Sequence, residues 1–198
     1  MQLKAPAIVL AGRAHGENAV ILRMLTEEAG LVAAYVAGGQ GRRLRPVVIP
    51  GNAVEADIRA RSASQLPFGK VELVTSRAPW LNEPLPAAAI LWVTALTASA
   101  LPERNPYPRL YEALGGLLDA ICHAPSARGW APALLSYEAL LLRDLGYGGL
   151  KPEPGELPET LDALRRIAPA LERYLLADRR GDAMAARTRL IERLARIA

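Results

Sequence analysis

The chain has 198 residues, of which 51% are hydrophobic and 22% are charged, and its formal net charge is +4. This composition excludes an intrinsically disordered chain and predicts one domain or two small ones, each with an apolar core. Because Cys122 is the single cysteine, a disulfide framework and a cysteine-rich zinc site are excluded, and we expect Cys122 to be a buried core thiol.

Two apolar segments raise the question of export or membrane insertion. The stretch 7–11 is too short for the core of a signal peptide. The stretch 85–101 contains Pro, Thr and Ser, and we expect it to form a buried helix and not a membrane span. The sequence therefore favours a cytoplasmic protein.

The first part of the chain has the pattern of β-strands. Short runs that are apolar or alternate between apolar and polar residues occur at 7–10, 19–25, 31–36, 53–59 and 70–74. Gly, Pro and Asn separate these runs and indicate turns. Five short strands in about 75 residues favour a small barrel, and an OB-fold has that strand count.

From residue 84 the pattern changes to helices. Prolines, which are tolerated in the first turn of a helix, precede runs at 87–100, 109–122 and 134–145 with leucines at helical spacing, and further helical segments follow residue 160. The predicted fold class is therefore α+β, with an OB-fold β-barrel domain at 1–80 and an α-helical bundle domain at 81–198.

The positive charge is concentrated in the predicted barrel. Residues 1–80 carry 10 Lys and Arg against 6 Asp and Glu, whereas residues 81–198 carry 14 of each. The segment 38–45, Gly-Gly-Gln-Gly-Arg-Arg-Leu-Arg, contains three arginines and no acid. Such a cluster is typical of a polyanion-binding surface, although a solvated surface loop has the same composition.

A phosphate-binding role follows if the segment 38–50 projects from the rim of the barrel between two strands. Guanidinium groups are forked, permanently charged donors that suit phosphate. The predicted nucleic-acid-binding residues are Arg13, Arg42, Arg43, Arg45 and Lys70. Binding of this kind depends on the DNA backbone and steeply on salt, and it carries no sequence information.

Aromatic residues are few, at 5% of the chain. Before Trp80 only Tyr35 and Phe68 occur, and Tyr35 fits the core as well as it fits a binding face. We therefore expect weak base stacking by the barrel. For Trp80, Trp92 and Trp130 core packing is favoured over a groove, since large aromatics dominate core burial.

No catalytic motif is recognisable in the sequence. Gly69-Lys70 resembles the end of a phosphate-binding loop, but Val71 replaces the Ser or Thr that would hold Mg²⁺. The pair His15 and Glu17 lacks a candidate nucleophile, and the adjacent Cys122 and His123 cannot converge on one metal ion. We expect a protein that is not an enzyme, with no catalytic residues, no cofactor and no metal.

Several segments together resemble one protein family. The segment 7–31 contains an apolar strand, His-Gly-Glu and Thr-Glu-Glu-Ala-Gly, and the segment 35–46 contains a glycine-rich basic loop. The most specific segment is 137–148, Tyr-Glu-Ala-Leu-Leu-Leu-Arg-Asp-Leu-Gly-Tyr-Gly. In this order they resemble the RecO family of bacterial recombination mediators, over about residues 5–150.

The resemblance implies an N-terminal OB-fold, a C-terminal α-helical domain and no enzyme activity. It also implies binding to single- and double-stranded DNA, annealing of complementary strands and association with RecR. Members help RecA to replace the single-stranded DNA-binding protein SSB during gap repair, close to the nucleoid. In some members the helical domain binds the acidic C-terminal tail of SSB.

The sequence departs from the family pattern in three places. Ala37 stands where the basic loop usually has Lys, and the four-cysteine zinc module of many members is absent. Leu135 and Ser136 stand where basic residues often serve the SSB tail, which leaves Arg109 and Arg143 as candidate partner-binding residues. The alternative interpretation is a protein-interaction scaffold of the same family with weak or no intrinsic DNA binding.

Overall fold

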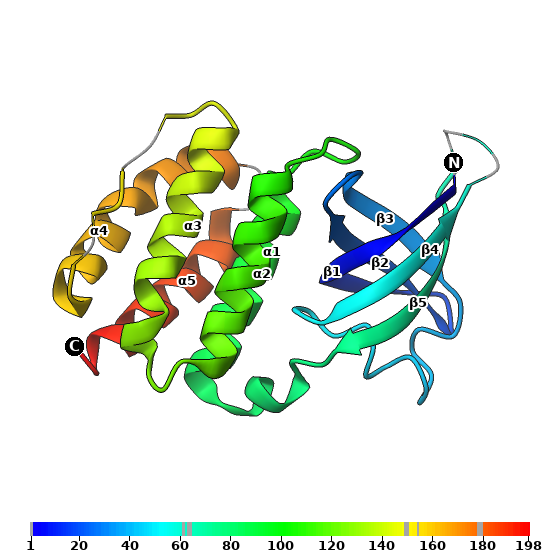
Figure 1. Cartoon of the computed structure of the whole chain (residues 1–198), viewed down its shortest axis with the longest axis horizontal. Coiled ribbons are helices and arrows are strands. Elements are labelled where there is room, and N and C mark those ends of the chain that lie inside the picture. Colours follow the sequence, from blue (N-terminus) through cyan, green and yellow to red (C-terminus); the bar gives the residue numbers. More distant parts are fainter. Residues whose placement is uncertain (1, 61, 63–64, 149–150, 154, 178–179) are drawn as a thin grey trace. The chain divides into compact units, whose positions relative to one another are not determined.

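The first five predicted runs form strands that close into a barrel (Figure 1). The barrel is seen in a computed structural model that describes residues 2–60, 62, 65–148, 151–153, 155–177 and 180–198. Its strands are β1 (Gln2–His15), β2 (Ala19–Thr26), β3 (Gly30–Val36), β4 (Ala53–Arg59) and β5 (Phe68–Thr75). All five strands were expected from the sequence, and each is present.

The strand order β1-β2-β3-β5-β4 closes through pairing of β4 with β1. β3 pairs with β5 in parallel, whereas the other four pairs are antiparallel. This is the connectivity of an OB-fold, a five-stranded Greek-key barrel. The structure therefore confirms the predicted OB-fold.

β1 is longer than its apolar run because it serves two neighbours. Its first half pairs with β4 and its second half with β2, and the register shifts between Val9 and Ala11. A β-bulge of this kind bends a strand and increases its twist, which allows one strand to close a barrel. The residues after Leu10, Ala-Gly-Arg-Ala-His, do not continue the apolar run, so the sequence pattern does not show this second half as a strand.

Alternate side chains of the strands fill the barrel. Val20, Leu22 and Met24 of β2 point inwards, as do Val32, Ala34 and Val36 of β3. The inward residues are almost fully buried, and the alternation places residues such as Tyr35 on the outer face.

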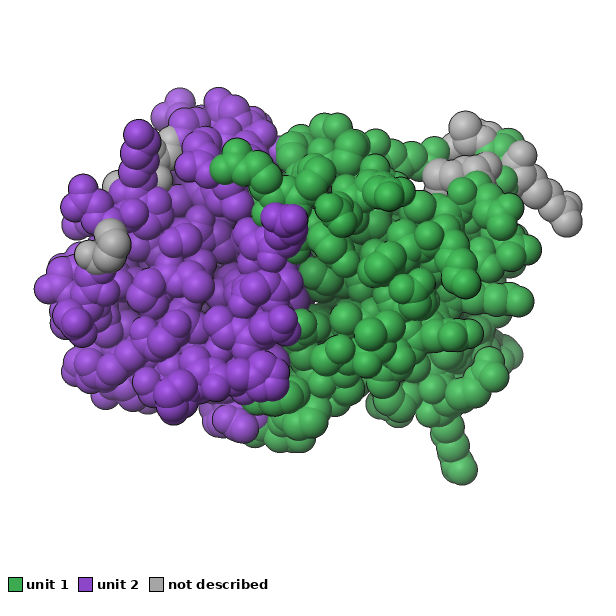
Figure 2. All heavy atoms as spheres, viewed as in Figure 1, with its two compact units in different colours: residues 1–82, 101–111 green, residues 83–100, 112–198 purple. Residues whose placement is uncertain are grey.

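A segment distant in sequence completes the barrel unit. The chain divides into two compact units, residues 1–82 with 101–111 and residues 83–100 with 112–198 (Figure 2). The amide of Arg104 donates a hydrogen bond of 2.8 Å to the carbonyl of Leu31, at the start of β3. Gly30 has a φ of +67°, and a Cβ there would lie 1.9 Å from the carbonyl oxygen of Asn105, so only glycine fits beneath this segment.

The units are therefore not continuous in sequence. The predicted domain division into 1–80 and 81–198 stays a prediction, and the compact units depart from it in the segment 101–111. The short helix η1 (Ala78–Asn82) ends the first stretch of the barrel unit.

Helices form the second unit, as the sequence predicts. They are α1 (Pro84–Ala100), α2 (Pro108–His123) from Glu112 onwards, η2 (Ala127–Gly129), α3 (Ala131–Asp144), α4 (Leu157–Ala170), the π-helical η3 (Leu171–Leu175) and α5 (Arg180–Ala195). The fold class α+β is confirmed. Pro169 lies near the end of α4, where its missing N–H accounts for the change to π geometry.

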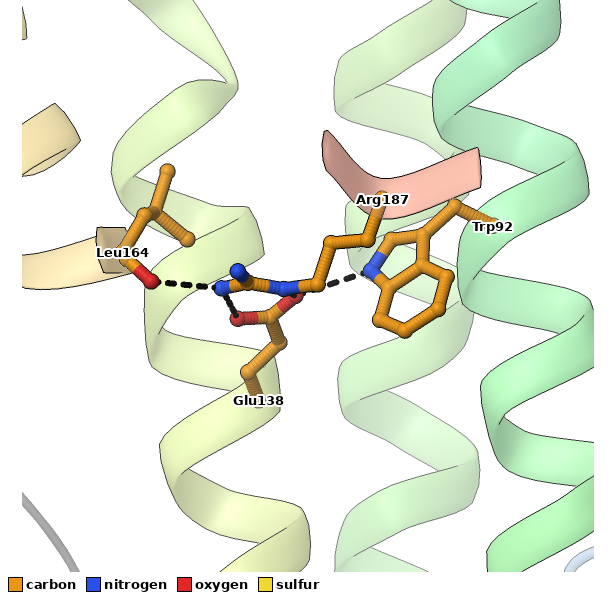
Figure 3. Close-up of polar contacts among 4 residues, drawn as sticks. All are labelled: Trp92, Glu138, Leu164 and Arg187. Atoms are coloured by element: carbon orange, nitrogen blue, oxygen red, sulfur yellow. Dashed lines mark hydrogen bonds and ion pairs between the residues drawn. The ribbon is translucent and has the colours of Figure 1, made fainter. Parts of the chain in front are cut away.

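A buried polar network connects four helices of this unit (Figure 3). Arg187 of α5 binds both carboxylate oxygens of Glu138 of α3, at 2.9 and 2.6 Å, and donates to the carbonyl of Leu164 of α4 at 2.7 Å. The indole Nε1 of Trp92 of α1 donates to Glu138 Oε1 at 2.8 Å. Every oxygen of the buried carboxylate therefore has a charge-assisted partner.

The aromatic and thiol predictions for the core hold in this unit. Trp92 and Trp130 are buried, and so is Cys122. Trp80, in the barrel unit, is half-buried.

Candidate nucleic-acid interface

The basic segment after β3 folds into two successive hydrogen-bonded turns. The carbonyl of Gly41 accepts hydrogen bonds from the amides of Leu44 and Arg45, at 3.1 and 2.9 Å. The carbonyl of Leu44 accepts from Val47 and Val48 in the same way, at 2.9 and 3.1 Å. We call residues 41–48 the basic turn.

The basic turn is amphipathic. Leu44, Val47 and Val48 have the i, i+3, i+4 spacing of one helix face, and they pack against the apolar core of the barrel. Arg42, Arg43 and Arg45 are exposed. The expectation that the segment projects from the rim is therefore wrong, because its apolar face folds back onto the barrel.

Two amide side chains fasten the basic turn at its ends. Gln40 Nε2 donates to the carbonyls of Gly16 and Ala19, at 3.2 and 2.9 Å, and so ties the segment to the turn between β1 and β2. Asn52 Nδ2 donates to the carbonyls of Pro46 and Val47, at 2.8 and 3.1 Å.

Asn52 is fully buried and also serves the start of η1. Its Oδ1 accepts a hydrogen bond of 2.8 Å from the amide of Arg77. Sequence reasoning missed both Gln40 and Asn52 as positioning residues. The sequence shows only a turn-forming composition around them. An amide that bonds to distant carbonyls leaves no periodic pattern in the sequence.

Gly39 has a packing role. It is buried, and a Cβ there would lie 2.9 Å from the side chain of Val20. The glycines before the arginines thus let the chain turn tightly over β2, and the arginine side chains are left to face solvent.

The arginines of the basic turn keep their charge uncompensated. Within the described part of the chain, Arg13, Arg42, Arg43 and Arg45 form no ion pair. Exposed guanidinium groups that are not held in ion pairs are available to bind phosphate, subject to screening by salt.

Lys70 and Arg43 line one groove of about 530 Å³ beside β5. Val36, Leu44 and Val71 also line it, and so does the acidic Glu72. The structure therefore brings these two predicted residues together. Arg13 lies on β1 next to Gly12, where a Cβ would be 3.7 Å from the carbonyl oxygen of Val48, so β1 passes close to the end of the basic turn.

The surroundings of Lys70 are less favourable to an anion than those of the basic turn. Lys70 of β5 lies opposite Asp57 of β4. Asp57 accepts two hydrogen bonds from Arg59, with Nε–Oδ1 at 3.0 Å and Nη2–Oδ2 at 2.7 Å. The bond to Arg59 lowers the pKa of Asp57, and the charges of Arg59, Lys70 and Lys4 lower it further. Asp57 is therefore a stable anion that weakens the electrostatic attraction of Lys70 and Arg59 for phosphate.

The two predicted partner-binding residues lie in different compact units. Arg109, in the first turn of α2, belongs to the barrel unit and is exposed. Arg143 of α3 belongs to the helical unit, and its Nε lies 3.7 Å from Asp144 Oδ1. Of the two positions where basic residues were expected from the family, Leu135 is buried and Ser136 is exposed.

Two features are absent from the described residues. Among the helices described, none has the length and hydropathy needed to cross a bilayer. The described ranges also contain no group of three or more His, Cys, Asp or Glu side chains placed to hold a metal ion.

Comparison with known proteins matches both halves of the chain. Residues 1–77 match the family model described as "Recombination protein O N terminal", and residues 82–148 match "Recombination protein O C terminal". A protein of Phenylobacterium zucineum named "DNA repair protein RecO" is 40% identical over 75% of this chain and 60% of its own length. Proteins of the same name from Gluconacetobacter diazotrophicus and Paracoccus denitrificans are 39% and 40% identical, over 59% and 60% of their length. The chain thus spans about 60% of the length of these curated relatives.

Proposed function

Because this chain belongs to the RecO family, we propose that it is a recombination mediator in DNA repair that binds DNA through its barrel. The observation that carries the proposal is the basic turn. It presents Arg42, Arg43 and Arg45 to solvent on a rigid support, with no ion pair to a described residue.

The chemistry of this surface suits the sugar-phosphate backbone. Each arginine that contacts a phosphate releases condensed counterions, so affinity comes from charge and falls steeply with salt. Contacts to phosphate carry no sequence information. A mediator that works on DNA gaps of any sequence requires this kind of binding.

Arg13 and Lys70 extend the proposed surface along β1 and β5. Lys70 shares its groove with Arg43, and its contribution is reduced by Asp57. We rank the basic turn first, Arg13 second and Lys70 third for binding of the backbone.

The proposed protein partners follow from the family and not from a described contact. They are RecR, SSB and RecA, with strand annealing and the loading of RecA onto SSB-coated DNA as the proposed activities. Arg109 and Arg143 remain candidate partner-binding residues, and their placement in different units means that each is to be tested alone.

The test is fluorescence-anisotropy binding to a labelled single strand and to its duplex over a series of salt concentrations. We expect Arg42→Ala with Arg43→Ala to weaken binding to both. The slope of log K against log salt should become shallower by about 1.5, since each phosphate contact contributes roughly 0.7–0.9.

The matched control is Arg165→Ala with Arg166→Ala. These are also two adjacent exposed arginines, and they lie on α4 of the helical unit. This control should leave the slope unchanged. An unchanged slope in the Arg42/Arg43 variant would place the DNA surface elsewhere, and no binding by the wild type at low salt would favour the scaffold alternative.

A further inference from the structure

The outer face of the barrel carries a line of residues that the basic turn does not account for. Cross-strand pairing places Arg13 opposite Ile21, Ile21 opposite Tyr35, Tyr35 opposite Phe68 and Phe68 opposite Arg59. Directly opposed residues share one face of a sheet. These five residues therefore form a continuous line across all five strands, which we call the aromatic row.

The rings at the centre of the row hold one another in place. The centroids of Tyr35 and Phe68 are 5.3 Å apart at an interplanar angle of 69°, and His15 lies 5.8 Å from Tyr35 at 85°. Edge-to-face contacts of this kind are favourable and fix the orientation of each ring. The aromatic surface is thus preorganised.

Phe68 is not part of the barrel core. It is 67% exposed, the highest value among the large apolar side chains of the described residues. It also lines a hollow of about 680 Å³ with Arg59, Gln65 and Leu66. Exposure of a phenyl ring costs free energy relative to burial, so a surface that retains it is a candidate for contact with a ligand.

The position of the row within the fold points to a nucleic acid. OB-folds bind oligonucleotides on the face of strands 2 and 3, between the loop that joins strands 1 and 2 and the loop that joins strands 4 and 5. His15 ends β1 just before the first of these loops, and Phe68 begins β5 just after the second. The aromatic residues therefore lie within this face.

The unpaired charge at one end of the row favours a polyanion over an apolar protein partner. Arg13, at one end, has no ion pair with a described residue, whereas Arg59, at the other end, is paired with Asp57. Flat apolar rings beside an unpaired arginine match a single strand, which alternates flat bases with phosphates.

We propose that Phe68 and Tyr35, supported by His15, stack on unpaired bases, so that the barrel favours single-stranded over double-stranded DNA. The inference rests on the proposed function and deepens it. The small number of aromatic residues predicts weak base stacking, but the strand register brings two of them together on one face. Bases in a duplex are already stacked, so only a single strand can use the row.

The experiment is anisotropy binding of the full chain to an oligothymidylate, to an abasic strand of the same length and to a duplex. We expect Phe68→Ala to weaken oligothymidylate binding by roughly 5- to 150-fold, the range for loss of one stacked base. Binding to the abasic strand and the duplex should change by less than about twofold, and the salt slope should stay that of the wild type.

Two variants keep the test specific. Phe68→Trp retains a stacking surface and should restore oligothymidylate binding. Val74→Ala is the matched control, because Val74 is on the same strand, is 61% exposed and lies outside the aromatic row. It should bind all three probes as the wild type does.

The outcomes separate this inference from the proposed function. If Phe68→Ala binds oligothymidylate as the wild type does while the Arg42/Arg43 variant loses binding, the stacking inference is wrong and the proposed function stands. If Phe68→Ala changes only the oligomeric state in sedimentation, the row is a protein contact and the inference is also wrong. Equal losses on all three probes would show a folding defect or a backbone contact, and would overturn stacking too.

Discussion

The barrel unit and the helical unit both depend on arginine, in opposite surroundings. In the helical unit the Arg187 side chain is 3% exposed and is bound to Glu138 and to a backbone carbonyl. In the barrel unit Arg42, Arg43 and Arg45 face solvent on the basic turn.

The comparison shows why the number of arginines says little about function. A buried guanidinium must have its charge matched, because an unpaired charge in an apolar interior is costly. An exposed guanidinium contributes little to folding and keeps its charge for a ligand. Substitution of the buried arginine should therefore change stability, whereas substitution of the exposed arginines should change DNA binding.

The largest expected effect is on the buried pair. Arg187→Met leaves the carboxylate of Glu138 buried without its ion-pair partner, and should lower the free energy of unfolding by about 3–5 kcal/mol. Urea denaturation of the variant measures this loss. Adding Glu138→Gln should recover part of it, since no charge is then buried. A loss below about 1 kcal/mol would show that the network is not what holds these four helices together.

The next effect is on the support of the basic turn. Asn52→Ala removes the donors to the carbonyls of Pro46 and Val47 and the acceptor for the amide of Arg77. We expect a loss of about 2 kcal/mol in stability, because buried polar groups lose their partners. DNA binding should also weaken, with a shallower salt slope.

Asn52→Asp separates the two roles of Asn52. It keeps the acceptor for Arg77 but cannot donate to the basic turn. It should therefore weaken DNA binding as much as the alanine variant does. If DNA binding by both variants equals that of the wild type while stability falls, the fastening of the turn does not matter for binding.

The smallest expected effect concerns the difference between paired and unpaired cations on the barrel. Asp57→Asn removes an anion that lies between Arg59 and Lys70, and should tighten DNA binding at low salt by a factor of about two to five. Its stability should change by less than about 0.5 kcal/mol, since the pair with Arg59 is exposed.

The control for this variant is Asp162→Asn on α4. Asp162 also pairs with an exposed arginine, Arg165, at 2.9 Å, but it lies in the helical unit. It should leave DNA affinity unchanged. Equal tightening by both variants would mean that net charge, and not the local field of the barrel, governs the affinity.

Much of the fold could be predicted because it is local. The alternation of strands such as 53–59 and the helical spacing of leucines in 134–145 each arise within a few residues, and the prolines mark where helices begin. The exposed arginines at 42, 43 and 45 could be named for the same reason. The amphipathic spacing of Leu44, Val47 and Val48 is equally local and indicates the apolar face of the basic turn.

What only the tertiary structure decided depends on pairing between distant residues. The register of five strands aligns Arg13, Tyr35 and Phe68 in one row, and a shift of a single residue would turn Phe68 into the core. The same register places Asp57 beside Lys70, so a cation that looks equivalent in the sequence is partly neutralised. By itself the sequence determined which segments are strands and helices and where the charge is concentrated. Which side chains meet was decided by long-range hydrogen bonding and packing, since no local pattern encodes the partner of a strand.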